Sequence, residues 1–438
     1  MPTDRKEYMY STDALNWQES AITPLSPGAK IYIKGNIGKT TGLSQIPFPI
    51  SNSYSFKIGG NALTLLDYSG ILEDYDNACY SMFRSCSSLV DASQLYIDKV
   101  GESMCYDMFS SCSRLVTPPS LPATTLAKLC YHEMFSGCTL LATAPQLPAT
   151  TLADKCYYSM FSGCTSLTQV ELSATTLAQE CYANMFSGCT SLTKVEVSAT
   201  TLAKDCCRSM FYGCTSLTQA DLPATSSAYS CYYQMFQGCT SLTTISELPA
   251  TTLADLCYEK MFSNCTSLTT APLLPATNLA LSCYERMFTG CTALTQAPAL
   301  PATNLAQNCY YQMFQDCTAL TTAPALPATN LAQHCYNYMF SGCTSLTTAP
   351  ALPSIQEIWA VVPAYDYMFK NCTSLKVYST SGEGHDVEWR IPSEGVFPGQ
   401  YSSTGSTMFS GTTGDYSSSS VSFKAGEAVV VYTQNQPV

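Results

Sequence analysis

The stretch CYYSMFSGCTSLT, residues 156–168, decides the fold, because the chain repeats it many times. Close copies follow one another every 25 or 26 residues, and their first cysteines are Cys130, Cys181, Cys206, Cys231, Cys257, Cys283, Cys309 and Cys335. Variants one residue shorter between their cysteines begin at Cys79 and Cys105, and a last copy runs from Ala364 to Cys372. These twelve units over residues 75–377 predict a solenoid, since one short unit cannot bury its apolar flank alone and a stack of units can.

Each unit is predicted to hold one helix and one short strand. Counted from the first cysteine, Met at +4 lies on the same helical face as the cysteine, and Tyr at +1 and Phe at +5 lie on the adjoining stripe. A glycine such as Gly163 would end the helix. The next segment, QVEL at residues 169–172, alternates as a strand with its Val and Leu inward. Many copies have proline in this segment, which predicts very short or irregular strands. The linker LPATTLA would then lead to the next unit with its leucines inward.

The units CYxxMFSGCTSLT and APxLPATTLA resemble the BspA-like leucine-rich repeats of gut Bacteroidetes and their bacteriophages. The resemblance covers residues 75–377, and the period fits the roughly 20–29 residues of leucine-rich repeats. It implies a right-handed solenoid with extracellular binding roles and no catalysis. The expected fold is therefore an α/β repeat solenoid of twelve stacked units. Family resemblance does not identify a ligand.

Both ends of the predicted solenoid are expected to carry β-rich caps. In residues 1–74 the runs at 29–34 and 53–58 alternate like strands, and in residues 378–438 the runs at 420–424 and 428–432 do the same. The Ser/Gly/Thr-rich stretch at 402–420 is loop-like. We expect the three tryptophans, Trp17, Trp359 and Trp389, to pack within these ends.

The 24 cysteines are predicted to be small buried apolar residues stacked in ladders. Two cysteines eight residues apart in a helix would lie about 12 Å from each other, beyond the reach of a disulfide. Ala364 replaces the first cysteine of the last unit while Cys372 remains, which also argues against an obligate pair. Disulfides and a metal framework stay open as alternatives, and Cys207 is the cysteine that we expect to be exposed.

The composition excludes several classes of protein. Hydrophobic residues make up 46%, which excludes a disordered chain, and charged residues only 12%, about half of the usual share of roughly 25%. The net charge is −12 and no basic run is present, so nucleic-acid binding is set aside. We expect no membrane span and no export signal in residues 1–20. No catalytic or cofactor motif appears, so we expect neither an enzyme nor a bound cofactor.

Three consecutive units carry an acidic residue seven positions after the second cysteine, namely Glu171, Glu196 and Asp221. In register, these carboxylates would stack about 5 Å apart and favour a cation or a basic partner. The alternative is a solvated acidic row, relieved by the neighbouring Lys194, Gln169 and Gln219. Those three side chains are also candidates for contacting a ligand.

A second candidate surface lies at the two variable positions that follow Cys-Tyr. These positions hold Tyr158 and Ser159, Arg208 and Ser209, Tyr233 and Gln234, Glu285 and Arg286, and Tyr311 and Gln312. Exposed tyrosine and arginine beside polar side chains suit the recognition of proteins or sugars. Unconstrained drift of surface residues would explain the same variation.

Three functions follow from these patterns. The first is a bacteriophage virion surface or tail-associated protein that binds a protein or glycan on a host or in mucus, with other virion proteins as further partners. The second is a bacterial cell-surface or secreted adhesin, and the third is an intracellular interaction scaffold. The β-rich ends could support a homo-oligomer. None of these functions involves nucleic acid or insertion into a membrane.

Overall fold

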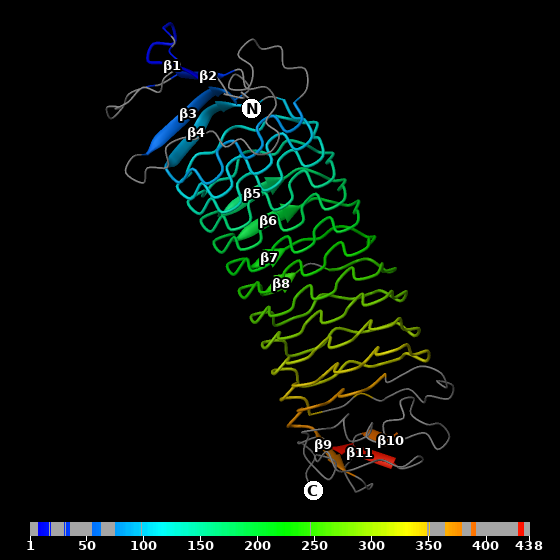
Figure 1. The fold of residues 1–438 in the computed structure, drawn as a ribbon. Helices are drawn as coiled ribbons and strands as arrows, with labels where there is room; N and C mark the ends of the chain where they lie inside the picture. Colours follow the sequence, from blue (N-terminus) through cyan, green and yellow to red (C-terminus); the bar gives the residue numbers. More distant parts are fainter. Residues whose placement is uncertain are drawn as a thin grey trace, which may run out of the picture. The chain divides into compact units, whose positions relative to one another are not determined.

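Each repeat forms one coil of the chain, and successive coils stack on one another (Figure 1). The structure is a computed structural model, and it describes residues 8–16, 18, 30, 32–35, 55–62, 75–97, 99–245, 247–347, 350, 364–378, 387–390 and 428–432. The chain divides into two units, Met1–Ala174 and Thr175–Val438, which we describe one at a time. The predicted stack of short repeats is therefore present within each of these two compact units.

The cysteine segment, from just before the first cysteine to the second, is not an α-helix. Among the described residues the structure has strands and turns but no α-helix, so the predicted helix and the α/β class are wrong. Every second backbone N–H group donates to a carbonyl outside the segment, as when Tyr131 N donates to Cys156 O of the next coil at 3.0 Å. The N–H groups between them close turns, as when His132 N donates to Leu129 O at 3.2 Å. Only half of the backbone N–H groups donate within the segment, whereas in an α-helix every N–H group after the first four would do so.

Left-handed backbone at every fourth residue explains this hydrogen-bond pattern. In one copy Lys155, Ser159 and Gly163 have φ values of 55°, 50° and 72°. Each such residue breaks the run of right-handed residues, and only glycine takes this conformation without steric cost. The four-residue period places the same side chains inward as a helix of 3.6 residues per turn would. That coincidence makes the sequence resemble an amphipathic helix.

Ladders of identical side chains fill the core of each unit. The Met, Phe and Cys side chains of the cysteine segments are buried throughout the described repeats. Phenylalanine rings of successive coils stack, with centroids 5.6 Å apart for Phe109 and Phe135 and again for Phe236 and Phe262. All 24 cysteines are free and buried, as the ladder interpretation predicts. The helical distance between the two cysteines of a unit no longer applies.

The buried tyrosine position of the repeat explains the irregular cysteines. Cys105 N donates to Cys130 O at 2.9 Å, as Tyr131 N does to Cys156 O one coil later, so Cys105 occupies the tyrosine position. Cys207 takes the same position and is 0% exposed, so the expectation that it is exposed is wrong. The Cys207 side chain thus lies at the position that the stacked tyrosine rings of Tyr131 and Tyr157 occupy in other repeats.

The strands of the unit Met1–Ala174 are short. β1 (Tyr8–Ser11) pairs antiparallel with β2 (Tyr32–Gly35). β3 (Phe56–Asn61) pairs parallel with β4 (Leu89–Tyr96), with register shifts near Lys57. β5 (Gln169–Leu172) alternates with Val170 and Leu172 buried and Gln169 and Glu171 exposed, which confirms the predicted orientation.

The strands of the unit Thr175–Val438 shorten along the repeats. β6 (Lys194–Val197) has four residues, whereas β7 (Gln219–Ala220) and β8 (Thr244–Ile245) have two each and pair in parallel. Later repeats, which carry Ala-Pro in this segment, make single bridges such as Thr270 to Gln296. Proline lacks the ladder donor, so this finding confirms the prediction of short, irregular strands.

The last strands of this unit form an antiparallel sheet in the order β10-β11-β9. β9 (Lys376–Tyr378) and β10 (Val387–Arg390) flank β11 (Ala428–Tyr432), which coincides with the predicted run at 428–432. The predicted strand at 29–34 overlaps β2, and that at 53–58 overlaps β3. The runs at 402–420 and 420–424, with Trp17 and Trp359, lie outside the described residues, as does the Trp389 side chain. The packing predicted for the tryptophans stays a prediction.

Candidate ligand-binding surface

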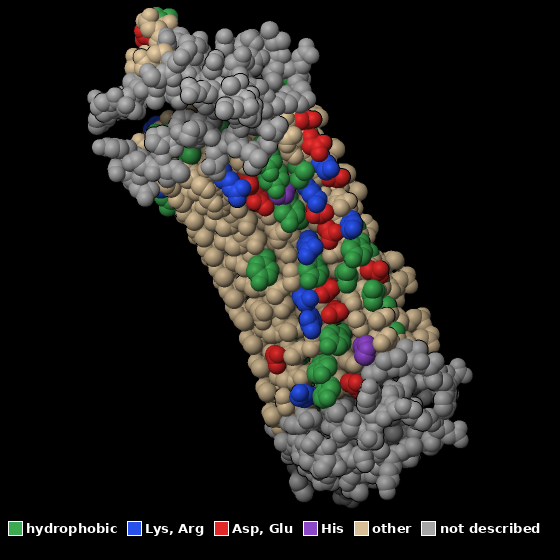
Figure 2. Space-filling model, in the orientation of Figure 1, with side chains coloured by type: hydrophobic (Ala, Val, Ile, Leu, Met, Phe, Trp, Pro, Cys, Tyr) green, Lys and Arg blue, Asp and Glu red, His purple; other side chains and the backbone are tan. Residues whose placement is uncertain are grey.

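Within each of the two units, the two residues directly before the methionine of each cysteine segment form a row of variable side chains, and we call these two rows the variable stripe. In the first unit it consists of Tyr80 and Ser81, Tyr106 and Asp107, His132 and Glu133, and Tyr158 and Ser159. In the second unit it consists of Ala183 and Asn184, Arg208 and Ser209, Tyr233 and Gln234, Glu259 and Lys260, Glu285 and Arg286, Tyr311 and Gln312, Asn337 and Tyr338, and Asp366 and Tyr367. Figure 2 shows charged and hydrophobic side chains gathered beside a surface that consists of other side chains and of backbone.

Four rings of the first unit form a continuous aromatic ladder on the variable stripe. Tyr80 stacks on Tyr106, Tyr106 on His132, and His132 on Tyr158, with centroids 4.6, 4.2 and 4.6 Å apart. The planes are nearly parallel in every pair. Because each ring face meets its neighbour, the ladder offers a ligand ring edges and phenol oxygens instead of open faces.

Charged groups of the first unit cluster beside this ladder. Arg84 Nη1 donates to Asp107 Oδ2 at 2.8 Å. Burial raises the pKa of Asp107, although Arg84 opposes the shift. Burial and the negative charge of the nearby Asp107 raise the pKa of Glu133. Burial and Glu133 raise the pKa of Tyr106 to about 12. Two buried carboxyl groups that repel each other favour a state in which at least one of them is protonated.

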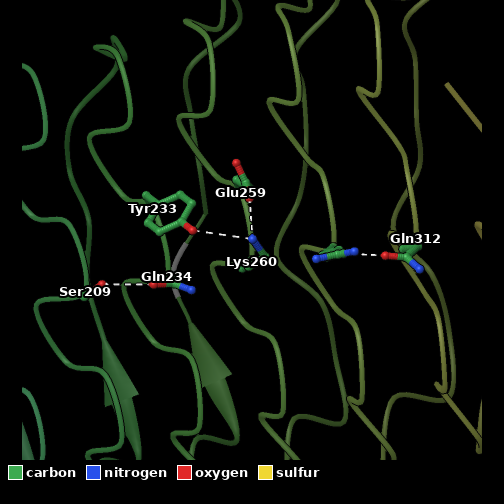
Figure 3. Close-up of polar contacts among 7 residues, drawn as sticks. Ser209, Tyr233, Gln234, Glu259, Lys260 and Gln312 are labelled. Atoms are coloured by element: carbon green, nitrogen blue, oxygen red, sulfur yellow. Dashed lines mark hydrogen bonds and ion pairs between the residues drawn. The ribbon is translucent and has the colours of Figure 1, made fainter. Parts of the chain in front are cut away.

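Cations flank the tyrosine rings in the second unit. The Arg208 guanidinium lies 5.1 Å from the ring centroid of Tyr233, and Lys260 Nζ lies 5.3 Å from the same centroid. Lys260 Nζ also donates to Glu259 Oε1 at 2.6 Å and to the Tyr233 hydroxyl at 3.4 Å (Figure 3). Desolvation lowers the pKa of Lys260, but the contacts with Glu259 and Tyr233 outweigh it and raise the pKa overall. Lys260 is therefore held in place as a cation.

Polar contacts continue along the same stripe. Ser209 Oγ donates to Gln234 Oε1 at 3.3 Å (Figure 3). Further on, Arg286 Nε donates to Gln312 Oε1, and the Arg286 guanidinium lies 5.6 Å from the ring centroid of Tyr311. Contacts between neighbouring coils thus order these side chains before any ligand binds.

The far part of the second unit's stripe is aromatic. Tyr338 stacks on Tyr367 with centroids 4.7 Å apart, and Lys370 Nζ lies 5.1 Å from the Tyr367 centroid. Burial raises the pKa of Glu285, a half-buried member of the stripe. The stripe therefore combines aromatic edges, paired cations and carboxylates, and of these side chains tyrosine and arginine are enriched in protein interfaces.

The candidate residues that the sequence predicts on or next to the strands are all exposed. Gln169 and Glu171 lie on β5 of the first unit, and Lys194 and Glu196 lie on β6 of the second. Gln219 begins β7, and Asp221 directly follows this strand. Lys194 Nζ lies 2.7 Å from Glu196 Oε1. This ion pair raises the pKa of Lys194 and lowers that of Glu196. It supports the interpretation as a solvated acidic row, and a cation at this row stays a prediction.

The repeated side chains match a known family model. The model for the BspA type leucine rich repeat region, in six copies, matches residues 133–269 and 259–383, which together exceed half of the chain. This chain belongs to the BspA-type leucine-rich-repeat family. A comparison with curated proteins finds no match in sequence.

Three solved structures of leucine-rich proteins are similar to this BspA-type chain. A leucine-rich repeat protein from Bacteroides ovatus shares 22% identity over 69% of this chain and 75% of its own, with a TM-score of 0.41. A leucine rich cell surface protein from Faecalibacterium prausnitzii shares 18% over 64% and 76%, with a TM-score of 0.32. A leucine-rich repeat protein from Eubacterium ventriosum shares 16% over 63% and 81%, also with a TM-score of 0.32.

The sequence alone did not indicate several members of the variable stripe. Tyr80 and Tyr106 were hidden because their units align on the first cysteine one residue out of step with the structure. Counting back from the methionine would have found them, together with His132 and Lys260. Lys370 follows the Met-Phe pair and could be placed only once its contact with Tyr367 was known.

Two further properties concern metals and membranes. In the described part of this BspA-type chain, no group of three or more His, Cys, Asp or Glu residues could hold a metal ion. The described residues also include no helix long and apolar enough to cross a membrane.

Proposed function

We propose that this BspA-type protein is a non-enzymatic recognition protein that binds a protein ligand through the variable stripe. One observation carries the proposal. The stripe gathers aromatic and charged side chains of successive repeats, such as Arg208, Tyr233 and Lys260, on a chain with only 12% charged residues. Tyrosine and arginine dominate the energetics of protein interfaces, and side chains already ordered by neighbours cost less entropy to bind with.

The proposed setting is the outside of a cell or a virion, where the ligand is a molecule on a bacterial or host surface. Family membership supports a surface role. Placement on a bacteriophage tail or virion, with other virion proteins as partners, is the narrower form of the proposal. Mass spectrometry of purified particles from a Bacteroidetes phage would test it, since the protein should be present in stoichiometric amounts. Its recovery only from bacterial envelopes would favour the adhesin alternative.

A binding experiment tests the stripe itself. The fluorescently labelled full chain is titrated onto intact Bacteroidetes cells, alongside the triple variant Arg208→Ser, Tyr233→Ser and Tyr311→Ser. We expect at least a tenfold loss of apparent affinity, because each truncated anchor at an interface costs about 1–2 kcal/mol or more. The matched control, Thr215→Ser with Thr240→Ser, changes exposed residues outside the stripe and should bind as the unmodified chain does. Equal binding by the triple variant would remove the stripe from the proposal.

The repeat pattern of the sequence supports further inferences about the fold. We infer twelve repeats in one right-handed stack over residues 75–377, with β-rich caps at 1–74 and 378–438 that could support a homo-oligomer.

Binding without catalysis also belongs to the proposal, and polysaccharide hydrolysis assays should show no activity. For Glu171, Glu196 and Asp221, calorimetric titration with millimolar calcium should be silent if these side chains form only a solvated row.

A further inference from the structure

An uncharged face extends over the strand side of three near-identical repeats of the second unit. Residues 266–278, 292–304 and 318–330 contain no Asp, Glu, Lys, Arg or His. Five rows of neutral polar side chains recur there, and we call them the neutral array: Thr266, Thr292 and Thr318; Thr269, Thr295 and Thr321; Thr270, Gln296 and Thr322; Thr277, Thr303 and Thr329; Asn278, Asn304 and Asn330. All fifteen are exposed except Thr318, which is half-buried.

Backbone bridges hold the rows of the neutral array in register. Thr270 bridges to Gln296 and Gln296 to Thr322, while Asn304 bridges to Asn330 in a second row. Equivalent side chains of successive repeats therefore recur at the spacing of parallel strands, about 4.8 Å. The array is periodic in the stacking direction and varies little across the three repeats.

Hydrogen bonds between repeats order several side chains of the array in advance. Thr321 Oγ1 donates to Thr295 O at 3.5 Å, and Asn330 Nδ2 donates to Asn304 Oδ1. Asn278 Nδ2 likewise donates to Thr252 Oγ1 at 3.3 Å. The donors used here point along the stack, so lone pairs of the oxygens remain for a ligand. Side chains ordered before binding lose less entropy on binding.

We propose that the neutral array binds an uncharged polysaccharide whose hydroxyl groups repeat along its length. An uncharged face gives an ionic ligand no charge to pair with, so the ligand would be desolvated without compensation. Hydroxyl and amide groups donate to and accept from sugar hydroxyls alike. The threonine methyl groups, with the exposed Pro275 and Pro301, supply apolar contacts for sugar C–H groups. Weak contacts repeated in register add up by multivalency.

Sedimentation with insoluble polysaccharides tests the proposal. The full chain is mixed with microcrystalline cellulose, chitin and insoluble β-glucan, and the protein left in solution is measured. We expect retention on at least one of the three, with at least a tenfold weaker apparent affinity for Gln296→Glu, because this change places a charge in the middle row. The matched control is Gln307→Glu, the same change at an exposed residue outside the array, which should bind as the unmodified chain does.

Two results would overturn the proposal. One is no retention on any of the three polysaccharides, and the other is equal retention of Gln296→Glu and the unmodified chain, with thermal unfolding showing both to be folded. The stripe variant carrying Arg208→Ser, Tyr233→Ser and Tyr311→Ser should still be retained. The neutral array and the variable stripe can thus fail independently of each other.

Discussion

At the residue scale, the second cysteine of most described repeats links its own coil to the preceding one. Cys138 Sγ donates to Phe109 O at 3.2 Å, and Cys265 Sγ donates to Phe236 O at 3.1 Å. Burial raises the pKa of Cys138 to about 12, so the thiol keeps the proton that it donates. The ladder of second cysteines thus combines close packing with a hydrogen bond to a buried carbonyl.

We therefore expect Cys265→Ala to lower the free energy of unfolding by about 1–2 kcal/mol, through loss of the thiol hydrogen bond and a small cavity. Chemical denaturation followed by circular dichroism measures this. The neighbouring Thr266→Ala changes an exposed side chain and should stay within about 0.5 kcal/mol of the unmodified chain. Equal effects of the two changes would contradict the role assigned to the thiol.

Two glycines at the same position of the repeat differ in their surroundings. Gly213 and Gly290 have φ values of +69° and +74°, but a Cβ at Gly213 would meet open space, whereas one at Gly290 would meet Asn264 Oδ1. Gly213→Ala should cost about 1–2 kcal/mol from the left-handed backbone alone. Gly290→Ala should cost more, and Asn264→Gly should remove the excess in a double-mutant cycle. No excess in thermal or chemical unfolding would show that Asn264 turns away without cost.

The Asp107–Glu133 pair predicts a dependence of stability on pH. Burial raises the pKa of both groups, so the folded state holds protons more tightly than the unfolded chain does. The pair's contribution is therefore complete below the ordinary carboxyl pKa and declines as the pH rises through the raised values. Glu133→Gln should stabilise the chain at neutral pH and flatten this decline, measured as melting temperature against pH. Glu171→Gln, at an exposed strand residue, is the control and should leave the decline unchanged.

At the element scale, the cysteine segment is a ribbon that divides its hydrogen bonds between its own turns and the next coil. Glu133 N donates to Tyr158 O of the following coil at 2.8 Å, while Met134 N donates to Tyr131 O within the segment at 3.3 Å. Every fourth residue is left-handed, so the segment cannot exist as an isolated helix. Its order depends on neighbours, as expected of solenoid repeats.

The far-ultraviolet circular dichroism spectrum should consequently lack the double minimum of an α-helix. A predicted α/β solenoid with twelve helices would show that minimum strongly, so the measurement separates the two folds. The control is thermal unfolding of the same sample, which should be cooperative and prove that the chain is folded. A helical spectrum from a cooperatively unfolding sample would contradict the ribbon.

The sequence predicts much of the element correctly and one part wrongly. Alternation in residues 169–172 correctly placed Val170 and Leu172 inward, because a period of two has a single structural meaning. The offsets of Met and Phe from cysteine were ambiguous, because four-residue turns and an α-helix bury the same positions. The signal that favours the turns is the row of residues suited to left-handed backbone, such as Gly163, Asn264 and Asp316, which occupy one position of the repeat.

At the scale of the whole molecule, repeats of equal length occupy equivalent places in the stack. The cysteines Cys257, Cys283 and Cys309 begin three consecutive repeats of 26 residues, and the backbone hydrogen bonds described for these repeats join neighbouring coils. The variable stripe was predictable in part for the same reason, since its position recurs while its side chains change. The pairing of Arg208 with Tyr233 could not be predicted, because it requires the register between coils.

Deletion of residues 283–308 should leave a folded protein with a slightly lower melting temperature. The deletion joins Ser282 to Cys309 and preserves every row, since neighbouring repeats supply most of the stability. Deletion of residues 283–295, half of the unit, should abolish cooperative unfolding, because it breaks the register of all the ladders it touches. Equal behaviour of the two deletions, measured by calorimetry, would contradict a stack of equivalent units.

In the described residues, the backbone hydrogen bonds between neighbouring cysteine segments run one way, from an N–H group to a carbonyl of the following coil, as from Phe135 N to Met160 O. A bare stack would therefore end in acceptors at its first coil and in donors at its last. Two copies could not extend this ladder by meeting through like ends; they would have to join head to tail, which leaves the same two ends open and grows a filament. Chain that covers either end would stop such growth.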